Sequence, residues 1–409
     1  MKCGLLGRKL AHSYSPAIHR HLGDYEYTLM EREPEELDEF FRRCDFDAIN
    51  VTIPYKEAVM KYCSSIDETA KKIGSVNTIV KKDGTLLGYN TDYFGFKLML
   101  ERLTDVNGKK VLVLGSGGSS KTVCAVVRDL GGEPVVISRT GENNYENISR
   151  HYDDTDVIVN TTPVGMYPNN LVSPIKLDDF TSVSAVLDII FNPSKTKLLL
   201  DAERLGIPCS NGLSMLVAQA KRASELFCDV SIPDSVIDGI LRSIRCEVLS
   251  IVLVGMPGSG KSVVGKRLAK NLGREFVDAD KYITDVSGRS PREIIEADGE
   301  AAFRRIESDA LRELCKRSSC VIATGGGAVT VKENFDVIRQ NSVVFYLKRD
   351  IAELQTSGRP LSAGGEDALR LLFERRREAY SAVADFEVES TGVINKTADV
   401  MKRIFCNCI

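Results

Sequence analysis

Residues 255–262, Gly-Met-Pro-Gly-Ser-Gly-Lys-Ser, have the composition and spacing of a phosphate-binding loop. The glycines let backbone N–H groups converge on a phosphate, and the start of the following helix adds its positive dipole end. The context agrees, because an apolar strand is expected at 248–254 and a helix at 262–272, ended by Gly273. A glycine turn in an ordinary α/β unit is the alternative. We predict that Lys261 holds the β- and γ-phosphates as a catalytic contact, that Ser262 ligates Mg²⁺, and that the nucleotide also contacts Gly258, Ser259 and Gly260.

Several segments after this loop narrow the choice of phosphoryl acceptor. Asp278-Ala-Asp280 ends the next apolar segment, where a carboxylate could orient a substrate hydroxyl or a metal-bound water. The glycine run 325–327 ends another predicted strand, a place where the backbone can approach a ligand closely. Each arginine alone is weak evidence, because an arginine on a helix is usually solvated. The arginines of interest are Arg304 and Arg376 on predicted helices and Arg359 in a Gly/Ser-rich loop that could act as a lid.

Together and in this order, these segments resemble shikimate kinase over residues 249–409. The resemblance implies that Asp280 binds the ring hydroxyls and accepts the proton of the attacking hydroxyl, while Asp278 supports Mg²⁺ through water. It also implies that Arg359 binds the nucleotide and neutralises charge on the transferring phosphoryl group. The substrate carboxylate is implied to bind the backbone of Gly326 and two arginines, Arg304 and Arg376, whose guanidinium groups can each form paired hydrogen bonds to a carboxylate.

A second glycine-rich loop lies in the first half of the chain. It follows a predicted strand at 110–114 and opens a helix running to about Leu130. The third glycine of the dinucleotide pattern is replaced by Ser120, so the loop alone is a weak signal. Arg139 comes 24 residues after Gly115, at the end of the next strand, where an arginine favours the 2′-phosphate of NADP over NAD. A plain surface charge is the alternative. The predicted cofactor contacts are Gly115, Ser116, Gly117, Gly118, Ser119, Ser138, Arg139 and Thr140.

The first 100 residues contain groups suited to reducing a ketone by hydride transfer. Such a reaction builds negative charge on oxygen, so a proton donor must be in reach. Lys56 can be that donor, with Asp92 holding it charged and oriented while binding an adjacent hydroxyl. Single Ser, Thr and Asn residues are more often turn formers than ligands. A polyhydroxylated carboxylate nevertheless needs neutral hydrogen-bonding groups, which could be Ser13, Ser15, Thr52 and Asn77.

Combined with three later segments, these residues are similar to the shikimate dehydrogenase family across residues 1–245. The segments are Asn160-Thr-Thr-Pro-Val-Gly-Met166, Asp188-Ile-Ile-Phe-Asn-Pro193 and Asn211-Gly-Leu-Ser-Met-Leu-Val-Ala-Gln219. The resemblance implies that Lys56 is the catalytic acid/base, that Gln219 joins the substrate contacts, and that Ile189 and Gly212 line the nicotinamide site. Phe191 is expected in the substrate site, at a position where family members commonly carry a tyrosine.

Short apolar runs alternate with helical patterns, which predicts α/β architecture with parallel sheets. The expected fold is a two-lobed dehydrogenase with a Rossmann-like NADP domain, then a P-loop kinase domain whose parallel sheet is flanked by helices. We place the dehydrogenase at 1–245, with a substrate lobe at 1–105 and 213–245 and an NADP lobe at 106–212, and the kinase at 246–409. A helical stretch at 214–240 is expected to return to the first lobe. The predicted strands are 110–114, 134–137, 156–160, 186–190, 248–254, 321–324 and 343–347, with a hairpin at 79–88.

Composition limits the classes of partner. A chain of 409 residues favours two or three domains, and 43% hydrophobic with 27% charged residues is typical of globular proteins. The net charge of −3 gives no reason to expect nucleic acid or an anionic membrane as a partner. No apolar run reaches the roughly 20 residues that span a bilayer. The eleven scattered cysteines, with no secretory signal before them, predict reduced thiols in the cytoplasm.

The two resemblances imply successive reactions on one small molecule. The first is NADPH-dependent reduction of 3-dehydroshikimate to shikimate, and the second is phosphorylation of shikimate to shikimate 3-phosphate with ATP and Mg²⁺. One alternative is a quinate or polyol dehydrogenase fused to a different small-molecule P-loop kinase. A regulatory protein with a dead site should have lost Lys56, Asp92, Lys261 or Asp280, and all four are present. The number of subunits and any direct transfer of shikimate between the sites stay open.

Overall fold

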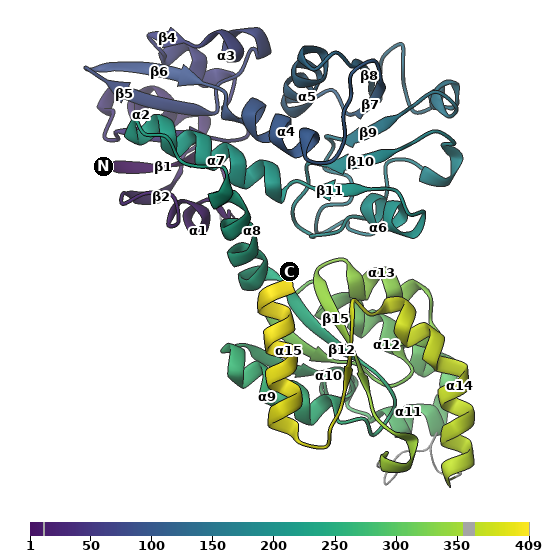
Figure 1. The fold of residues 1–409 in the computed structure, drawn as a ribbon. Coiled ribbons are helices and arrows are strands. Elements are labelled where there is room, and N and C mark those ends of the chain that lie inside the picture. The colour runs from purple at the N-terminus through teal and green to yellow at the C-terminus, as the bar shows by residue number, and fades with distance from the viewer. Residues whose placement is uncertain (11–12, 355–364, 409) are drawn as a thin grey trace. The chain divides into compact units, whose positions relative to one another are not determined.

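The computed structural model describes residues 1–10, 13–354 and 365–408. The chain forms two compact units (Figure 1). Unit 1 contains Met1–Met166, Val172–Phe191 and Asp201–Ile244, and unit 2 contains Tyr167–Leu171, Asn192–Leu200 and Arg245–Ile409. Two divisions fall inside helices, one between Leu200 and Asp201 in α6 (Lys197–Arg204) and the last in α8 (Ser235–Val248). Within the described ranges, no helix is both long and apolar enough to cross a membrane.

The first sheet of unit 1 has six strands in the order β2-β1-β3-β5-β6-β4. Strands β1, β2 and β3 run parallel, and the hairpin β5–β6 is antiparallel. The predicted hairpin is confirmed, with Asp83 and Gly84 at φ 50° and 75° in its turn. The strands are β1 (Lys2–Gly7), β2 (Glu26–Glu31), β3 (Ala48–Val51), β4 (Ser65–Ile66), β5 (Thr78–Lys82) and β6 (Thr85–Tyr89). The helices are α1 (Ser15–His19), η1 (Pro34–Glu36), α2 (Leu37–Arg43), η2 (Ala58–Tyr62) and α3 (Glu68–Ile73).

The second sheet of unit 1 is parallel, with five strands in the order β11-β10-β9-β7-β8. The four predicted strands of this sheet are present. Our prediction of a strand to residue 190 is wrong at its end, because the Asp188 carboxylate accepts a hydrogen bond from the Ile190 backbone N–H and the chain turns out of the sheet. The elements are β7 (Lys110–Leu114), α5 (Gly118–Asp129), β8 (Glu133–Ile137), η3 (Ile148–His151), β9 (Val157–Asn160), η4 (Leu177–Asp179), β10 (Ala185–Asp188), α6 (Lys197–Arg204) and β11 (Cys209–Asn211).

Helices α4 (Thr91–Glu101) and α7 (Leu213–Cys228) pack along each other between the two sheets of unit 1 (Figure 1). Phe96 and Met99 of α4 join the core of the second sheet, while Ala223 and Phe227 of α7 join the core of the first. The helical stretch expected at 214–240 is found as two helices, and its first part, α7, returns to the core of the first sheet. It is broken after α7, where Asp229 adopts a left-handed conformation with φ 53°, and α8 begins after the break.

Unit 2 is built on a parallel five-stranded sheet in the order β13-β14-β12-β15-β16. Its three predicted strands are all found, with ends shifted by one or two residues. The strands are β12 (Ser250–Val254), β13 (Glu275–Asp278), β14 (Cys320–Ala323), β15 (Ser342–Lys348) and β16 (Phe386–Glu389). The helices are α9 (Lys261–Leu272), α10 (Ala279–Ser287), α11 (Pro291–Asp298), α12 (Glu300–Leu314), η5 (Ala328–Thr330), α13 (Glu333–Arg339), η6 (Ile351–Glu353), α14 (Gly365–Val383) and α15 (Ile394–Cys408).

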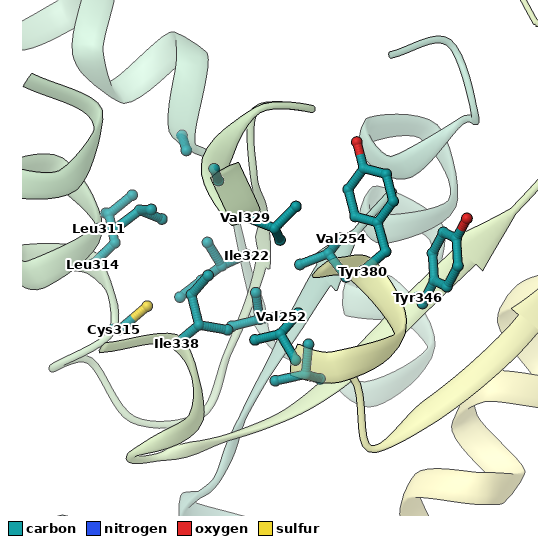
Figure 2. Close-up of a cluster of buried hydrophobic side chains, with 14 of the residues drawn as sticks. Val252, Val254, Leu311, Leu314, Cys315, Ile322, Val329, Ile338, Tyr346 and Tyr380 are labelled. Carbon is teal, nitrogen blue, oxygen red and sulfur yellow. The ribbon is translucent and has the colours of Figure 1, made fainter. Parts of the chain in front are cut away.

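The apolar core of unit 2 fixes the positions of its strand ends. Figure 2 shows the cluster that covers one face of the sheet, with Val252 and Val254 of β12 beside Ile322 of β14. Tyr346 of β15 and Tyr380 of α14 stack with ring centroids 5.0 Å apart. On the other face, Leu253 packs with residues of α9 and α15. The central strand is therefore buried on both sides, as parallel sheets require.

Replacing Leu253 tests whether β12 is the centre of this core. Leu253 is 0% exposed, so Leu253→Ala should lower the free energy of unfolding of unit 2 by about 2–5 kcal/mol through lost burial and a residual cavity. Urea unfolding followed by circular dichroism measures this loss. Val286→Ala on α10 is the matched control, because Val286 is 70% exposed and its loss should be within about 0.5 kcal/mol. Equal losses in the two variants would contradict the assignment.

Candidate functional sites

An ion pair between Lys56 and Asp92 is the charged centre of the candidate site in unit 1. The Lys56 Nζ lies 2.6 Å from Asp92 Oδ2, and the two side chains are 25% and 15% exposed. Lys56 follows β3, and its carbonyl accepts a hydrogen bond from the Val76 N–H. Asp92 lies in the first turn of α4, whose N-cap residue Asn90 accepts from the Tyr93 N–H. The predicted proton donor and the predicted carboxylate are 36 residues apart in the sequence, and the structure brings them together.

Buried amides and hydroxyls surround this pair. Asn77 Oδ1 accepts a hydrogen bond of 2.7 Å from the Thr91 N–H, the residue before Asp92. The Thr91 hydroxyl reaches Gln219 Oε1 of α7 at 3.3 Å. Two of the predicted substrate contacts, Asn77 and Gln219, are thus joined through Thr91, which was not among the predicted site residues. Its place between Asn90 and Asp92 was the available signal.

The remaining predicted substrate contacts come from separate segments. Ser13 and Ser15 are linked, because the Ser15 N–H donates to Ser13 Oγ over 3.2 Å at the start of α1. Thr52 follows β3, on the same loop as Lys56, and its N–H donates to the carbonyl of Leu6 in β1. Phe191 follows β10, and its ring contacts the ring of Tyr14. Within the part of the chain that the structure describes, these four residues are positioned by other contacts than a hydrogen bond or ion pair to Lys56 or Asp92.

The candidate dinucleotide loop lies between β7 and α5. Gly117 is the N-cap of α5 and Gly118 its first residue. Ser116 and Ser119 complete the loop with Gly115, whose N–H donates to the Ile137 carbonyl at the end of β8 over 2.8 Å. Free backbone N–H groups at the start of a twelve-residue helix suit a pyrophosphate.

Arg139 projects from the same edge of this sheet. The β7–β8 register pairs Leu114 with Ile137, so the glycine loop and the segment Ser138-Arg139-Thr140 follow adjacent strand ends. Arg139 is exposed, and the Ser138 hydroxyl donates to the Thr140 carbonyl. An exposed guanidinium at this place is free to approach a ribose phosphate.

The predicted nicotinamide site depends on a close approach between two backbone segments, one at Gly212 and one at Ile189 and Ile190. The Gly212 N–H donates to the Ile190 carbonyl over 3.0 Å. A Cβ at Gly212 would overlap the carbonyl of Ile189, so only glycine fits there. The two residues predicted for the nicotinamide site, Ile189 and Gly212, are 23 positions apart in the sequence. The structure brings them into contact at the start of α7.

In unit 2, the phosphate-binding loop joins β12 to α9. Lys261, the first residue of α9, donates hydrogen bonds to the carbonyls of Gly255 at 2.8 Å and Met256 at 3.0 Å. Gly258, Gly260, Lys261 and Ser262 line one cavity of about 410 Å³. Ser259 of the same loop is buried. The loop thus has the predicted context of strand, glycine turn and helix.

Ser262 and Asp278 are suited to Mg²⁺. The Ser262 hydroxyl donates to Asp278 Oδ2 over 2.5 Å, and Asp278 Oδ1 caps α10 by accepting from the Asp280 and Lys281 N–H groups. Mg²⁺ prefers oxygen ligands and keeps several waters, so a hydroxyl and a carboxylate beside a phosphate loop fit it. Among the described residues, no group of three or more His, Cys, Asp or Glu side chains could hold a metal ion. The fit therefore depends on these two oxygens together with the phosphates of a nucleotide.

Arg304 of α12 is fixed by two carboxylates. Its Nη1 lies 2.6 Å from Glu307 Oε2 and its Nη2 lies 2.8 Å from Glu300 Oε1. Glu307 is 0% exposed, and burial raises the pKa of its carboxyl despite the guanidinium. A Cβ at Gly327 would overlap the Arg304 guanidinium, which explains the glycine at this position. Glu307 was not predicted as a site residue, although its spacing of three from Arg304 on one helix face was a signal.

Arg376 and Tyr380 of α14 converge on the glycine run from the opposite side. Arg376 Nη1 donates to the Gly326 carbonyl over 3.0 Å, and the Tyr380 hydroxyl donates to the same oxygen. Burial raises the pKa of Tyr380 to about 12, so its hydroxyl stays protonated as a donor. The predicted carboxylate-binding set of Arg304, Gly326 and Arg376 is thus assembled.

The residues predicted to bind the nucleotide and those predicted to bind the acceptor line the same cavity of unit 2. Asp278, Asp280, Arg304, Gly326 and Arg376 line it together with the phosphate loop. A nucleotide and an acceptor can therefore meet in one enclosure. Arg359 lies outside the described residues. Residues that line the cavity without having been predicted include Glu307, Arg292, Phe303, Arg349 and Ser390.

Two family models match the chain. The model described as shikimate kinase matches residues 257–406. The model described as shikimate dehydrogenase substrate binding domain matches residues 5–79. The first matched range begins within the phosphate loop of unit 2 and contains its residues 257–262, and the second contains the Lys56 loop of unit 1.

Curated relatives cover the first part of the chain. The shikimate dehydrogenase (NADP(+)) of Methanosphaera stadtmanae is 36% identical over an alignment of 254 residues, and the match covers 55% of this chain and 90% of that protein. The protein with the same description from Caldicellulosiruptor bescii is 38% identical over an alignment of 258 residues, and the match covers 56% of this chain and 90% of that protein.

Solved structures agree with this alignment. Shikimate dehydrogenase 1 from Peptoclostridium difficile has 36% identity and a TM-score of 0.56, covering 60% of this chain and 98% of that chain. A chorismate mutase/shikimate 5-dehydrogenase fusion protein from Clostridium acetobutylicum has 36% identity and a TM-score of 0.56, covering 59% of this chain and 96% of that chain.

The phosphate loop makes a direct prediction about nucleotide binding. Lys261→Ala removes a charged donor to phosphate, so the dissociation constant for ATP should rise roughly ten- to a hundredfold. Equilibrium titration with a fluorescent ATP analogue measures it. Lys270→Ala is the matched control, because Lys270 is exposed in the last turn of the same helix. Equal affinity in Lys261→Ala and the wild type would argue against this loop as the nucleotide site.

Proposed function

Because the chain belongs to the shikimate dehydrogenase family and its second part matches the shikimate kinase model, we propose that it is a bifunctional enzyme of the shikimate pathway. The first activity reduces 3-dehydroshikimate to shikimate with NADPH. The second phosphorylates shikimate to shikimate 3-phosphate with ATP and Mg²⁺. The proposal is carried by the presence in one chain of the Lys56–Asp92 pair and of a cavity that unites a phosphate loop with acid-binding arginines.

In unit 1, Lys56 is the general acid for ketone reduction. NADPH, when bound, supplies the hydride. As charge develops on the carbonyl oxygen, the Lys56 ammonium donates a proton to it. Asp92 orients the ammonium at 2.6 Å and can accept a hydrogen bond from a neighbouring substrate hydroxyl. Asn77 and Gln219, held through Thr91, are positioned to bind further hydroxyls.

In unit 2, Asp280 is the group that orients and deprotonates the acceptor hydroxyl. Arg304 and Arg376 hold the substrate carboxylate, with Glu307 keeping the Arg304 guanidinium in place. Lys261 binds the β- and γ-phosphates of ATP, and Ser262 and Asp278 hold Mg²⁺, which when bound neutralises phosphate charge. Arg359 keeps its proposed role at the phosphoryl group.

Cofactor choice in unit 1 rests on Arg139. Its exposed guanidinium beside the glycine loop can pair with the 2′-phosphate that distinguishes NADP from NAD. Ser138 and Thr140 flank it on the adenosine side, and Ile189 and Gly212 form the nicotinamide side. A cytoplasmic location, and the expectation that neither nucleic acid nor membrane is a partner, stay predictions.

Single substitutions should separate the two activities. Lys56→Ala should lower kcat for 3-dehydroshikimate reduction by at least about a hundredfold, because the proton donor is lost, while shikimate phosphorylation stays near the wild-type rate. Lys261→Ala should do the reverse. NADPH oxidation at 340 nm and ATP-dependent formation of shikimate 3-phosphate measure the two rates.

Lys61→Ala is the matched control for the first variant, since Lys61 is exposed in the same lobe. A folded Lys56→Ala protein that reduces 3-dehydroshikimate at the control rate would refute the role of Lys56. Loss of both activities in either variant would refute separate sites. Comparison of shikimate with quinate, and of NADP with NAD, tests the substrate and cofactor assignments.

Glu307 should affect the acceptor rather than the nucleotide. Glu307→Gln removes the buried charge that orients Arg304, so KM for shikimate should rise about tenfold while KM for ATP changes little. Glu300→Gln is the matched control, because Glu300 also pairs with Arg304 but is half exposed, and its effect should be weaker. Equal increases in both KM values would speak against this assignment.

A further inference from the structure

Two aromatic rings meet between the two sheets of unit 1. Tyr14 is the N-cap residue of α1, beside the first sheet, and Phe191 follows β10 of the second sheet. Their ring centroids are 5.1 Å apart and the rings are tilted by 56°. Such a contact between residues from separate sheets needs both segments to be held in place.

The helix that Tyr14 caps is linked through a series of contacts to Thr91, the residue before Asp92. Tyr14 lies between Ser13 and Ser15, both proposed to contact the substrate. His19 of the same helix stacks on Tyr27 at 3.9 Å. From Tyr27 a chain of hydrogen bonds leads towards Asp92, and its successive members are Asn50, Thr78 and Thr91.

The segment of Phe191 is tied to the other side of the same site. Phe191 comes two residues after Ile189, whose carbonyl is covered by Gly212. Gly212 is the N-cap of α7, and α7 carries Gln219, which reaches Thr91. Both rings therefore belong to segments that converge on the proposed site of ketone reduction.

The two rings differ in their capacity to bind a polar ligand. Phe191 offers only an apolar face, whereas Tyr14 carries a hydroxyl. Tyr14 is half-buried, and burial raises the pKa of its phenol, so the group stays protonated at neutral pH and can donate a hydrogen bond. Among the residues that the structure describes, none hydrogen-bonds this hydroxyl.

We propose that Tyr14 is a substrate-binding residue of the dehydrogenase, and that its hydroxyl donates a hydrogen bond to an oxygen of the cyclic hydroxy acid from the Tyr14–Phe191 pair. This inference rests on the proposed function of unit 1. It adds a phenol to a site otherwise built from Ser, Thr, Asn and Gln side chains. Tyr14 thereby contributes to the discrimination of the hydroxy acid from less oxygenated analogues.

Moving the hydroxyl between the two rings tests this inference. Tyr14→Phe keeps the ring contact and removes one neutral hydrogen bond, so KM for 3-dehydroshikimate should rise roughly three- to tenfold, with KM for NADPH and the kinase constants unchanged. Adding Phe191→Tyr returns a hydroxyl to the pair and should bring KM back towards the wild-type value. Steady-state kinetics on the full chain measure these constants, without ATP for the dehydrogenase and with shikimate, ATP and Mg²⁺ for the kinase.

Tyr152→Phe is the matched control, because Tyr152 pairs with Phe180 at 4.9 Å elsewhere in unit 1. A wild-type KM in Tyr14→Phe, or an equal rise in Tyr152→Phe, would overturn the inference. So would a double variant as impaired as Tyr14→Phe. A wild-type chain that fails to reduce 3-dehydroshikimate would instead contradict the proposed function, and this inference would fall with it.

Discussion

Parallel strands end at one edge of a sheet, and the nucleotide sites of both units depend on that constraint. In unit 1, the ends of β7 and β8 bring the glycine loop beside Arg139. In unit 2, β12 and β14 bring the phosphate loop beside the glycine run, and β13 adds Asp278. The buried apolar faces of these strands fix their register, so polar groups that are far apart in sequence meet at the edge.

The two sites recognise similar molecules with different chemistry. Unit 1 surrounds one ion pair with neutral amides and hydroxyls, since reduction develops charge on a single oxygen that one proton neutralises. Unit 2 instead places Arg304, Arg376 and Lys261 around one cavity, which suits the proposed transfer of a phosphoryl group from a highly charged donor to a charged acid. The product of the first proposed reaction is the substrate of the second.

Local sequence patterns predicted the strands and helices whose formation depends on neighbouring residues. The strand at 110–114 and the helix of the phosphate loop follow from apolar runs next to glycines, and both are found. The break after Cys228 was missed, because it depends on a left-handed Asp229 within an otherwise helical pattern. Strand β10 ends early through the side chain of Asp188, which apolar periodicity does not reveal.

Within the candidate sites, motifs predicted residues but not the contacts that hold them. Lys56, Asp92 and the phosphate loop could be found from residue type and spacing. Thr91 and Glu307 act through hydrogen bonds to predicted residues, so their importance became visible only with distances. The Tyr14–Phe191 contact joins segments from two sheets, and no pattern in either segment indicates the other.

A coupled assay tests the central claim that one chain contains two separate pockets for one cyclic acid. Purified full-length protein is given 3-dehydroshikimate, NADPH, ATP and Mg²⁺, and products are followed by chromatography. The account predicts shikimate 3-phosphate, with one NADPH oxidised and one ATP consumed for each molecule formed. It predicts accumulation of shikimate when ATP is omitted. Absence of shikimate in that case, or failure of added shikimate to be phosphorylated, would contradict it.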